Sequence, residues 1–516
     1  MLVKIRSIAN IGLETVPVDV EVDVASAGFP GFTIVGLASK AVDEARERVK
    51  TAIVNSKLDF PPRKITVNLA PADLPKDGAA YDLPIALGLL LASGQLIAPE
   101  TDLTKSFFYG ELSLDGTLRP TRGILLLGLF AQSLGPTTVI FVPQPSAPEA
   151  AVISGTTVIP VSNLSQLIAH LSGQQKIAPL KLKITPESVD FTDVEFDLKE
   201  IAGQEQAKRA LIIAAAGGHN LLMWGPPGTG KTMLSKALSG ILPPLSAEEA
   251  LEVTRIYSVS GLLNPGQALL SRRPFRSPHH GVSGAGMIGG GSNPLPGEVS
   301  LAHLGVLFLD EMPEFPRSIL ESLRQPMEDG TVEIVRAAGH VKYPASFTLI
   351  AAINPCPCGY LNHPKRECKC TERQITKYRH RISGPILDRI DLFVPVSAVE
   401  TIKLAITGNN LPNTISSLDA KAQVIKARKV QEERFKKEQG LYTNSQMKNA
   451  HVKKYCFLTP ESENLLRLAA QKFDFSARSY FRLIKVSRTI ADLEGSSQIL
   501  PAHMAEALQY RQMYES

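Results

Sequence analysis

One short stretch, residues 225–232, limits what this chain can fold into more than any other feature of the sequence. It reads Gly-Pro-Pro-Gly-Thr-Gly-Lys-Thr and matches the phosphate-loop pattern G-x-x-x-x-G-K-[ST] in full. The apolar run Leu221–Trp224 precedes it, and a helix predicted over Met233–Leu242 follows it. This strand, loop and helix order is the context that the pattern requires.

The stretch predicts a site for the phosphates of ATP and for Mg²⁺. Glycines let backbone N–H groups curl around phosphate oxygens, and the following helix offers its N-terminus to the anion. Lys231 should reach the β- and γ-phosphates, and the Thr232 hydroxyl should bind Mg²⁺. The expected backbone cradle is Gly225, Pro226, Pro227, Gly228, Thr229 and Gly230. A Gly-rich turn without a ligand is the alternative, which the complete match disfavours.

Two further apolar runs extend the predicted site. Val306–Leu309 is followed by Asp310 and Glu311, and Phe347–Ile353 is followed by Asn354. Such runs are typical of parallel strands buried on both faces, and ligands bind at the carboxyl edge of an open parallel sheet. Asp310 fits the Mg²⁺ role and Glu311 can polarise the attacking water, although an ordinary acidic pair at a strand end is the alternative. Asn354 can hold the water or sense the γ-phosphate.

Length and composition restrict the classes of protein. The chain has 516 residues, which predicts three to four domains at about 150 residues each. With 44% hydrophobic and 20% charged residues it is too apolar to be disordered as a whole. The most apolar run, Leu83–Leu96, is interrupted by Pro84, Gly88, Gly94 and Gln95, which argues against a membrane span. The first residues lack the pattern of a signal peptide, so we expect a cytoplasmic protein.

Three blocks and a linker are predicted. Residues 1–173 mix alternating strands with helices, which indicates an α+β domain. Residues 174–198 are polar and spaced by prolines, as in a linker. Residues 199–396 alternate strands, helices and Gly-rich loops, which predicts an α/β core with a parallel sheet. Residues 397–516 have helical patterning.

Four of the five cysteines lie within a short segment that is also basic. Cys356, Cys358, Cys368 and Cys370 read C-x-C-x₉-C-x-C. Four thiolates at such spacing suit a tetrahedral Zn²⁺, while four reduced cysteines in a polar loop are the competing interpretation. From Leu361 to Arg381, seven lysines and arginines face two glutamates, an excess equal to the net charge of +5 of the whole chain. The segment could contact a phosphate backbone or be a solvated charged surface.

Two insertions are predicted within the core. Residues 278–291 are too rich in glycine for regular structure. Thr331–Val335 and Val341–Tyr343 alternate apolar residues around a turn with a glycine, which predicts a β-hairpin. Arg336, His340 and Lys342 lie in or beside the turn of this predicted hairpin.

The combination of motifs resembles the ComM/YifB family, within the magnesium-chelatase-like group of AAA+ ATPases. The resemblance covers nearly the whole chain. By this resemblance Arg389, in Leu-Asp-Arg, is an arginine finger that reaches a neighbouring subunit's site, and Arg478, in Ser-Ala-Arg, is the arginine of a helical lid. Taken alone, either arginine is typical of a solvated one. Other stretches that carry the resemblance are Gly31–Leu37, Asn55–Ser56, Pro75–Gly78, Phe275–His280, Asn354–Gly359 and Ser383–Pro385.

The family resemblance also implies a function and an assembly. It implies a ring, usually a hexamer, and ATP-driven branch migration that extends strand exchange when incoming DNA joins the chromosome during natural transformation or recombination. The inserts resemble the helix-2 insert and the presensor-1 hairpin of ring helicases. The presensor-1 hairpin carries a basic residue into the pore, so this resemblance makes Arg336, His340 and Lys342 the candidates for contact with DNA. A chelatase-type subunit that remodels a protein partner shares the core and is the main alternative.

The first block resembles a Lon-protease-type domain with a fold like that of ribosomal protein S5 domain 2. In that alignment Ala80 stands where the nucleophilic serine belongs, and the partner lysine falls on or near Leu125. A Ser–Lys dyad needs a hydroxyl nucleophile and an amine to activate it. We therefore expect a scaffold for ring assembly or DNA binding and not an ATP-dependent protease.

Overall fold

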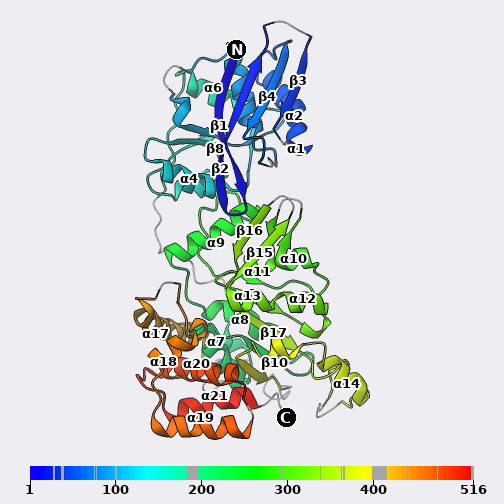
Figure 1. The fold of residues 1–516 in the computed structure, drawn as a ribbon, viewed down its shortest axis with the longest axis vertical. Helices are drawn as coiled ribbons and strands as arrows, with labels where there is room; N and C mark the ends of the chain where they lie inside the picture. Colours follow the sequence, from blue (N-terminus) through cyan, green and yellow to red (C-terminus); the bar gives the residue numbers. More distant parts are fainter. Residues whose placement is uncertain are drawn as a thin grey trace.

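The computed structural model describes residues 1–512, apart from 27–28, 37–39, 75, 77, 99–100, 183–195, 292–293, 337–338, 362, 364–365, 398–414, 439 and 474. The chain forms three bodies that follow one another along the long axis of the molecule (Figure 1). A mixed-sheet body lies at the N-terminal end, a body built on a parallel sheet lies in the middle, and a bundle of helices lies at the other end.

Within the described residues, the first body has a seven-stranded sheet in the order β3-β4-β2-β1-β5-β8-β9. β1 and β2 form a long antiparallel pair, and β5, β8 and β9 continue from β1 in parallel. Alternate residues of β2, namely Val18, Val20 and Val22, are buried, as period-two patterning predicts. The strands are β1 Leu2–Ile11, β2 Glu14–Val24, β3 Gly31–Val35, β4 Lys64–Ala70, β5 Ser106–Phe108, β8 Val139–Pro143 and β9 Thr157–Val161.

The helices of this body cover the sheet. α3, Asp82–Ala92, is almost completely buried because it packs against β1, β2 and α2. Its run of leucines explains why it reads as the most apolar segment of the chain. The remaining elements are α1 Lys40–Asp43, α2 Ala45–Asn55, α4 Ile124–Leu134, α5 Ala147–Ala151, α6 Leu164–Leu171 and the short strands β6 Glu111–Leu112 and β7 Leu118–Arg119.

The middle body confirms the predicted parallel sheet. In the described part of the chain its strand order is β11-β14-β17-β10-β18, with every pair parallel. The strands are β10 Leu221–Trp224, β11 Phe275–Arg276, β14 Val306–Leu309, β17 Thr348–Ile353 and β18 Leu392–Pro395. The helices are α7 Glu205–Gly217, α8 Lys231–Ile241, α9 Ala247–Ser260, α11 Glu298–Leu301, α12 Arg317–Ser322, α13 Arg324–Asp329, α14 Glu372–Arg379 and α15 Gly384–Leu387.

The Gly-rich insert differs from the prediction that it lacks regular structure. It contains α10, Gly284–Ile288, followed by β12 Gly289–Gly290, which pairs with β13 Leu295–Pro296. Ser283 caps α10 by accepting a hydrogen bond from the Gly286 N–H at 3.0 Å, and Met287 is fully buried. The cap and the burial together outweigh the low helix propensity of glycine.

The hairpin insert consists of β15 Thr331–Arg336 and β16 Gly339–Pro344, which pair in antiparallel register. Its base is anchored because Tyr343 is fully buried and its hydroxyl donates to the Pro294 carbonyl at 2.7 Å. Residues 337–338 at the turn lie outside the described residues, as does the side chain of Arg336.

The third body is helical, as predicted. It consists of α17 Ser417–Phe435, α18 Asn449–Tyr455, α19 Pro460–Lys472, α20 Ala477–Glu494 and α21 Pro501–Gln512. α17 packs against α7 and α8, and α20 packs against α7 and α21, so this body shares one core with the middle body. Among the described residues, no helix has the length and apolar character that crossing a membrane requires.

Among the described residues, the contacts between the first body and the middle body include the β1–β2 turn and the start of α4. The β1–β2 turn reaches the β15–β16 hairpin, where a Cβ on Gly12 would lie 2.3 Å from Val341 Cγ1 (Figure 1). The Gly123 N–H donates to the Ser258 carbonyl at 3.0 Å, and the Ser258 hydroxyl donates to Glu149 Oε2 at 2.6 Å. α4 therefore packs against the end of α9.

Candidate nucleotide site and its surroundings

The phosphate loop joins β10 to α8 at the carboxyl edge of the parallel sheet. Gly228 and Gly230 have φ values of 77° and 88°, a left-handed conformation that favours glycine. A Cβ added to either would meet nothing within 4 Å, so the loop faces open space where phosphates would lie. Gly230 caps α8 without a side-chain hydrogen bond, which leaves the helix N-terminus suited to an anion.

Lys231 is buried at the start of α8. Its Nζ donates to the carbonyls of Gly225 at 2.7 Å and Pro226 at 2.8 Å, and lies 3.3 Å from Oδ1 of Asn354. Burial lowers the pKa of Lys231 to about 8, although the charges of Asp310 and Glu311 oppose this shift. The residue is therefore a desolvated cation at the place where the γ-phosphate is expected.

Oxygen ligands for Mg²⁺ lie beside it. The Thr232 hydroxyl donates to Asp310 Oδ2 at 2.9 Å, so α8 and the end of β14 bring one hydroxyl and one carboxylate together. Hard oxygen donors of this kind are what Mg²⁺ prefers. The residues present thus fit both ATP and Mg²⁺.

Glu311 has an unusual backbone conformation. Its φ is 49°, in the left-handed region that non-glycine residues rarely adopt, and its N–H donates to Asp310 Oδ1 at 3.0 Å. Strain of this kind persists where the surrounding structure imposes it, which often happens at functional sites. The left-handed backbone of Glu311, directly after the expected Mg²⁺ ligand Asp310, therefore marks this position as part of the candidate site.

Arg389 and Arg478 lie at the other edge of the same sheet. Arg389 precedes β18, and its carbonyl accepts from Asn220 Nδ2 at 2.9 Å, directly before β10 begins. Lys231 follows the opposite end of β10, and a four-residue strand is roughly 13 Å long at about 3.3 Å per residue. Both arginines bind Glu328 of α13, Arg389 through Nη2 at 2.5 Å. The chain therefore does not bring either arginine to its own phosphate loop.

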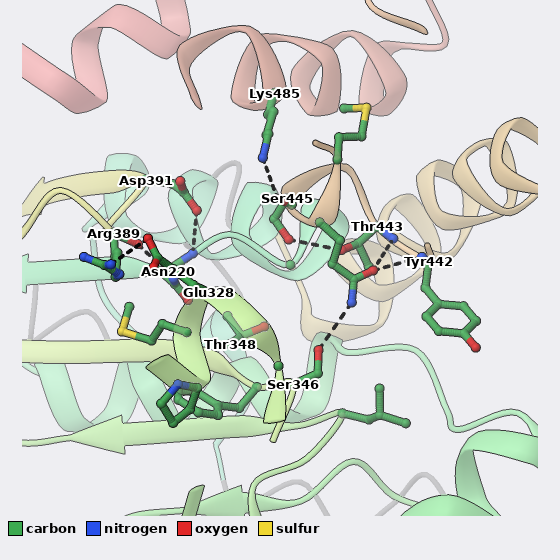
Figure 2. Close-up of a pocket in the computed structure, with 18 of the residues that line it drawn as sticks. Asn220, Glu328, Ser346, Thr348, Arg389, Asp391, Tyr442, Thr443, Ser445 and Lys485 are labelled. Carbon is green, nitrogen blue, oxygen red and sulfur yellow. Dashed lines mark hydrogen bonds and ion pairs between the residues drawn. The ribbon is translucent and has the colours of Figure 1, made fainter. Parts of the chain in front are cut away.

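The two arginines line a cavity of about 780 Å³ between this edge of the sheet and the helical body. Asn220, Thr348 and Asp391, at the amino ends of three strands, form part of its wall (Figure 2). Figure 2 also places Glu328 beside Arg389. Burial alone would raise the pKa of Glu328, but its hydrogen bond with Arg389 and the charge of Arg478 hold that pKa below its ordinary value.

The four cysteines converge, as a metal site requires. Their sulfur atoms all lie within 4.8 Å of one another, and Cys356 Sγ is 3.4 Å from Cys358 Sγ and 3.6 Å from Cys368 Sγ. A tetrahedral Zn²⁺ with Zn–S bonds of about 2.3 Å places its sulfurs about 3.8 Å apart, so the cluster fits the ion. The Leu361 N–H also points to Cys356 Sγ at 3.3 Å, the kind of contact that supports a thiolate ligand.

The cysteine turn also touches the phosphate loop. A Cβ on Gly359 would lie 2.6 Å from Cδ of Pro227, so this turn packs directly on the loop. Asn354 lies two residues before Cys356, and its side chain reaches Lys231. The spacing of the cysteines predicted a cluster but gave no sign of this contact.

Two of the three hairpin residues proposed for DNA contact, His340 and Lys342, lie near the same acid, Glu333. His340 Nε2 lies 3.6 Å from Glu333 Oε2, and Lys342 Nζ lies 3.4 Å from Glu333 Oε1. Both side chains are more than half exposed, so the pairs are weak. Glu333 was not singled out from the sequence, although its place opposite Lys342 follows from the hairpin register.

The positions that align with a protease dyad are apolar and buried. Ala80 is 3% exposed, and Leu125 is fully buried against Val152, Ile153 and residues 251 and 269 of the middle body. No hydroxyl or amine stands at either position. Pro75 and Asp77 of the stretch that suggested this comparison lie outside the described residues.

The comparisons with known proteins cover the same three bodies. Models described as subunit ChlI of Mg-chelatase, magnesium chelatase subunit ChlI, and magnesium chelatase subunit ChlI C-terminal match residues 20–145, 197–404 and 414–511. Competence protein ComM of Haemophilus influenzae is 43% identical over 512 residues, which covers 99% of this chain and 97% of that protein. The chain belongs to the ComM/YifB family.

Other relatives differ in how much of this chain they match: YifB matches nearly all of it, and a chelatase subunit matches less than a third. YifB of Salmonella typhimurium is 43% identical over 506 residues, covering 98% of this chain and 96% of that protein. The magnesium-chelatase 38 kDa subunit of Rhodobacter capsulatus is 29% identical over 179 residues, covering 31% of this chain and 50% of that protein. The family domains are those of a magnesium-chelatase-type AAA+ ATPase, in agreement with the phosphate loop and the parallel sheet.

Proposed function

We propose that this protein is an ATP-driven ring motor, a hexamer that acts on DNA in the cytoplasm. Its work is branch migration, which extends strand exchange when incoming DNA is integrated during natural transformation or homologous recombination. Single-stranded and branched DNA are its substrates, and other recombination proteins are its partners.

The observation that carries this proposal is the match to a competence protein over 99% of the chain. Because all three bodies are shared, the N-terminal body and the hairpin belong to the conserved machine and not to an unrelated addition. Competence concerns the uptake of DNA, which makes DNA the natural substrate of the motor.

Within the motor, the residues at the carboxyl edge would bind and hydrolyse ATP. Lys231 and the phosphate loop bind the phosphates, and Thr232 and Asp310 hold Mg²⁺, which neutralises charge on the β- and γ-phosphates. Glu311 orients and polarises the attacking water, while Asn354, held beside Lys231, senses the γ-phosphate. None of these groups is an arginine. In this site, therefore, no guanidinium group among the described residues of the same chain stabilises the negative charge of the transition state.

The absence of Arg389 and Arg478 from the phosphate loop of their own chain supports a ring. Arg389 and Arg478 lie together at the amino edge of the sheet, so in a head-to-tail assembly they would face the carboxyl edge of the next subunit. An arginine finger supplied in this way stabilises the charge on the transferred phosphoryl group and raises the rate about 10³- to 10⁵-fold in well-studied hydrolases.

DNA contact is assigned to the β15–β16 hairpin and to the basic surface near α14. Arg336, His340 and Lys342 would bind the phosphate backbone, whose contacts are independent of sequence and weaken with salt. Zn²⁺ held by the four cysteines would fix the loop that carries part of the basic surface.

ATP turnover measured with and without DNA tests the proposal. Single-stranded or branched DNA should raise the rate of hydrolysis severalfold, and the rise should disappear at high salt. The alternative, a chelatase-type subunit that remodels a protein partner, predicts hydrolysis that DNA does not change. The match to the 38 kDa chelatase subunit covers only 31% of this chain, which makes this alternative the weaker candidate.

A further inference from the structure

Glu328 binds two arginines that come from different bodies of the molecule. It stands near the end of α13, Arg389 lies between α15 and β18, and Arg478 is the second residue of α20. Both guanidinium groups reach the same oxygen, Oε1, through their Nη2 atoms. Because two groups bound to one oxygen lie close together, their positive charges would repel each other without this carboxylate.

The position of Arg389 depends on few other contacts. Its side chain is 5% exposed, its Nη1 donates to the Pro385 carbonyl at 2.5 Å, and its Nε is buried without a hydrogen-bond partner among the described residues. Removal of Glu328 would leave a buried guanidinium held by one carbonyl. A charged group in that situation moves toward another acid or toward water.

The three side chains carry a net charge of +1 and line the cavity at the amino edge. A γ-phosphate has several oxygens, each of which accepts hydrogen bonds from guanidinium groups as a carboxylate does. A pair of arginines held together by one carboxylate therefore brings two guanidinium groups to one place, as the binding of a phosphate requires.

We propose that Glu328 is a positioning residue, which holds Arg389 and Arg478 together as a receptor for the nucleotide of the neighbouring subunit. The inference rests on the proposed function, because it requires that the two arginines act between subunits. Glu328 itself touches neither nucleotide nor water in this scheme. Its role is to keep two repelling cations in one place.

The test uses Glu328→Gln in the full-length protein, with Glu321→Gln as the matched control. Glu321 lies in the adjacent helix α12, binds Arg324 at 3.0 Å and is exposed to a similar extent. Loss of Glu328 should lower kcat about tenfold to a hundredfold, as expected for misplaced catalytic groups. KM for ATP should change little because the phosphate loop of the same chain is intact, and Glu321→Gln should behave as wild type.

Mixing experiments separate this inference from the proposed function. Glu311→Gln subunits cannot hydrolyse ATP but carry intact arginines, so mixing them with Glu328→Gln subunits should restore activity. Arg389→Ala mixed with Glu311→Gln provides the reference. If that reference mixture is not restored, the arginines do not act between subunits and the ring proposal falls.

Two outcomes overturn the role of Glu328 alone. One is wild-type kcat for Glu328→Gln, and the other is failure of its mixture while the Arg389→Ala mixture is restored. If Glu328→Gln does not assemble, Glu328→Asp replaces it, since it keeps the charge but shortens the reach. A lower kcat at unchanged KM supports the role of Glu328, and wild-type kcat refutes it.

Discussion

At the scale of single residues, the proposed chemistry depends on two groups in energetically unfavourable states, a buried lysine and a glutamate with a left-handed backbone. Lys231 donates to two carbonyls of its own loop, and its burial lowers its pKa to about 8. Glu311 adopts a left-handed backbone that few glutamates tolerate. Such unfavourable states persist where the surrounding structure imposes them, which often happens at functional sites.

Replacement of Glu311 by Gln should separate nucleotide binding from hydrolysis. An amide of the same size cannot polarise water, while Thr232 and Asp310 still hold Mg²⁺, so ATP binding should stay within a fewfold of wild type and turnover should fall at least a hundredfold. Lys231→Ala should lose binding as well. Titration with a fluorescent ATP analogue and steady-state turnover measure the two effects, and near wild-type turnover in either variant would contradict the assigned site.

Replacement of Glu333 by Gln should strengthen DNA binding. The change frees His340 and Lys342 from their shared acid, so affinity should rise about two- to fivefold at low salt and the salt dependence should steepen. Lys342→Ala should weaken binding and flatten the salt dependence. Fluorescence anisotropy at several ionic strengths measures both, with ATPase activity without DNA as the control. Equal affinities for the two variants would place the DNA elsewhere on the protein.

At the scale of elements, short segments are placed by what they contact. The cysteine turn packs against Pro227 of the phosphate loop, so a metal that fixes the turn also fixes part of the nucleotide site. The β1–β2 turn, likewise, contacts the hairpin through Gly12 and Val341. These contacts join the predicted zinc site to the phosphate loop, and the N-terminal body to the hairpin that we propose contacts DNA.

Metal analysis of anaerobically purified protein should find about one Zn²⁺ per chain. Removal of the metal, or Cys370→Ser, should weaken ATP binding severalfold because Gly359 no longer supports Pro227. Cys456→Ser is the control, since Cys456 is buried in the helical body away from the cluster. Zinc-free protein with unchanged ATP affinity would contradict the coupling, and absence of zinc in fresh protein would refute the site.

The elements also explain how far the sequence could predict the structure. The phosphate loop, Asp310 and the cysteine cluster were predictable because fixed spacing along the chain carries their geometry. α10 was not, because a capping serine and one buried methionine decide the conformation of a glycine-rich segment. Glu328 was not either, since its two partners lie 61 and 150 residues farther along the chain. Contacts between residues so far apart in the sequence are set by tertiary packing, which no local sequence pattern reveals.

At the scale of the whole molecule, the N-terminal body is joined to the middle body by a contact that we expect to depend on pH. Glu149 is buried at the interface, where its Oε2 accepts a hydrogen bond from the Ser258 hydroxyl at 2.6 Å. This burial raises the pKa of Glu149 to about 7. A carboxyl whose folded pKa exceeds its ordinary value stabilises the structure below that ordinary value and loses this contribution as pH rises through the folded pKa.

Stability should therefore fall between about pH 4.5 and pH 7 through Glu149. Glu149→Gln stays neutral, so its stability relative to wild type should increase with pH, on the order of 2 kcal/mol by about pH 8. Thermal unfolding at several pH values measures the difference, and Glu47→Gln, an exposed position of α2, is the control. A difference that does not vary with pH would show that Glu149 stays ionised at the interface.

The central claim is that hydrolysis at the sheet edge moves DNA, and strand displacement from a three-strand branched DNA tests it most directly. With ATP, wild-type protein should displace the strand, while Glu311→Gln should bind the same DNA and displace nothing. The double variant Arg336→Ala, Lys342→Ala should retain basal ATPase and lose displacement. Displacement by Glu311→Gln at the wild-type rate, or none by wild-type hexamers that hydrolyse ATP, would contradict the account.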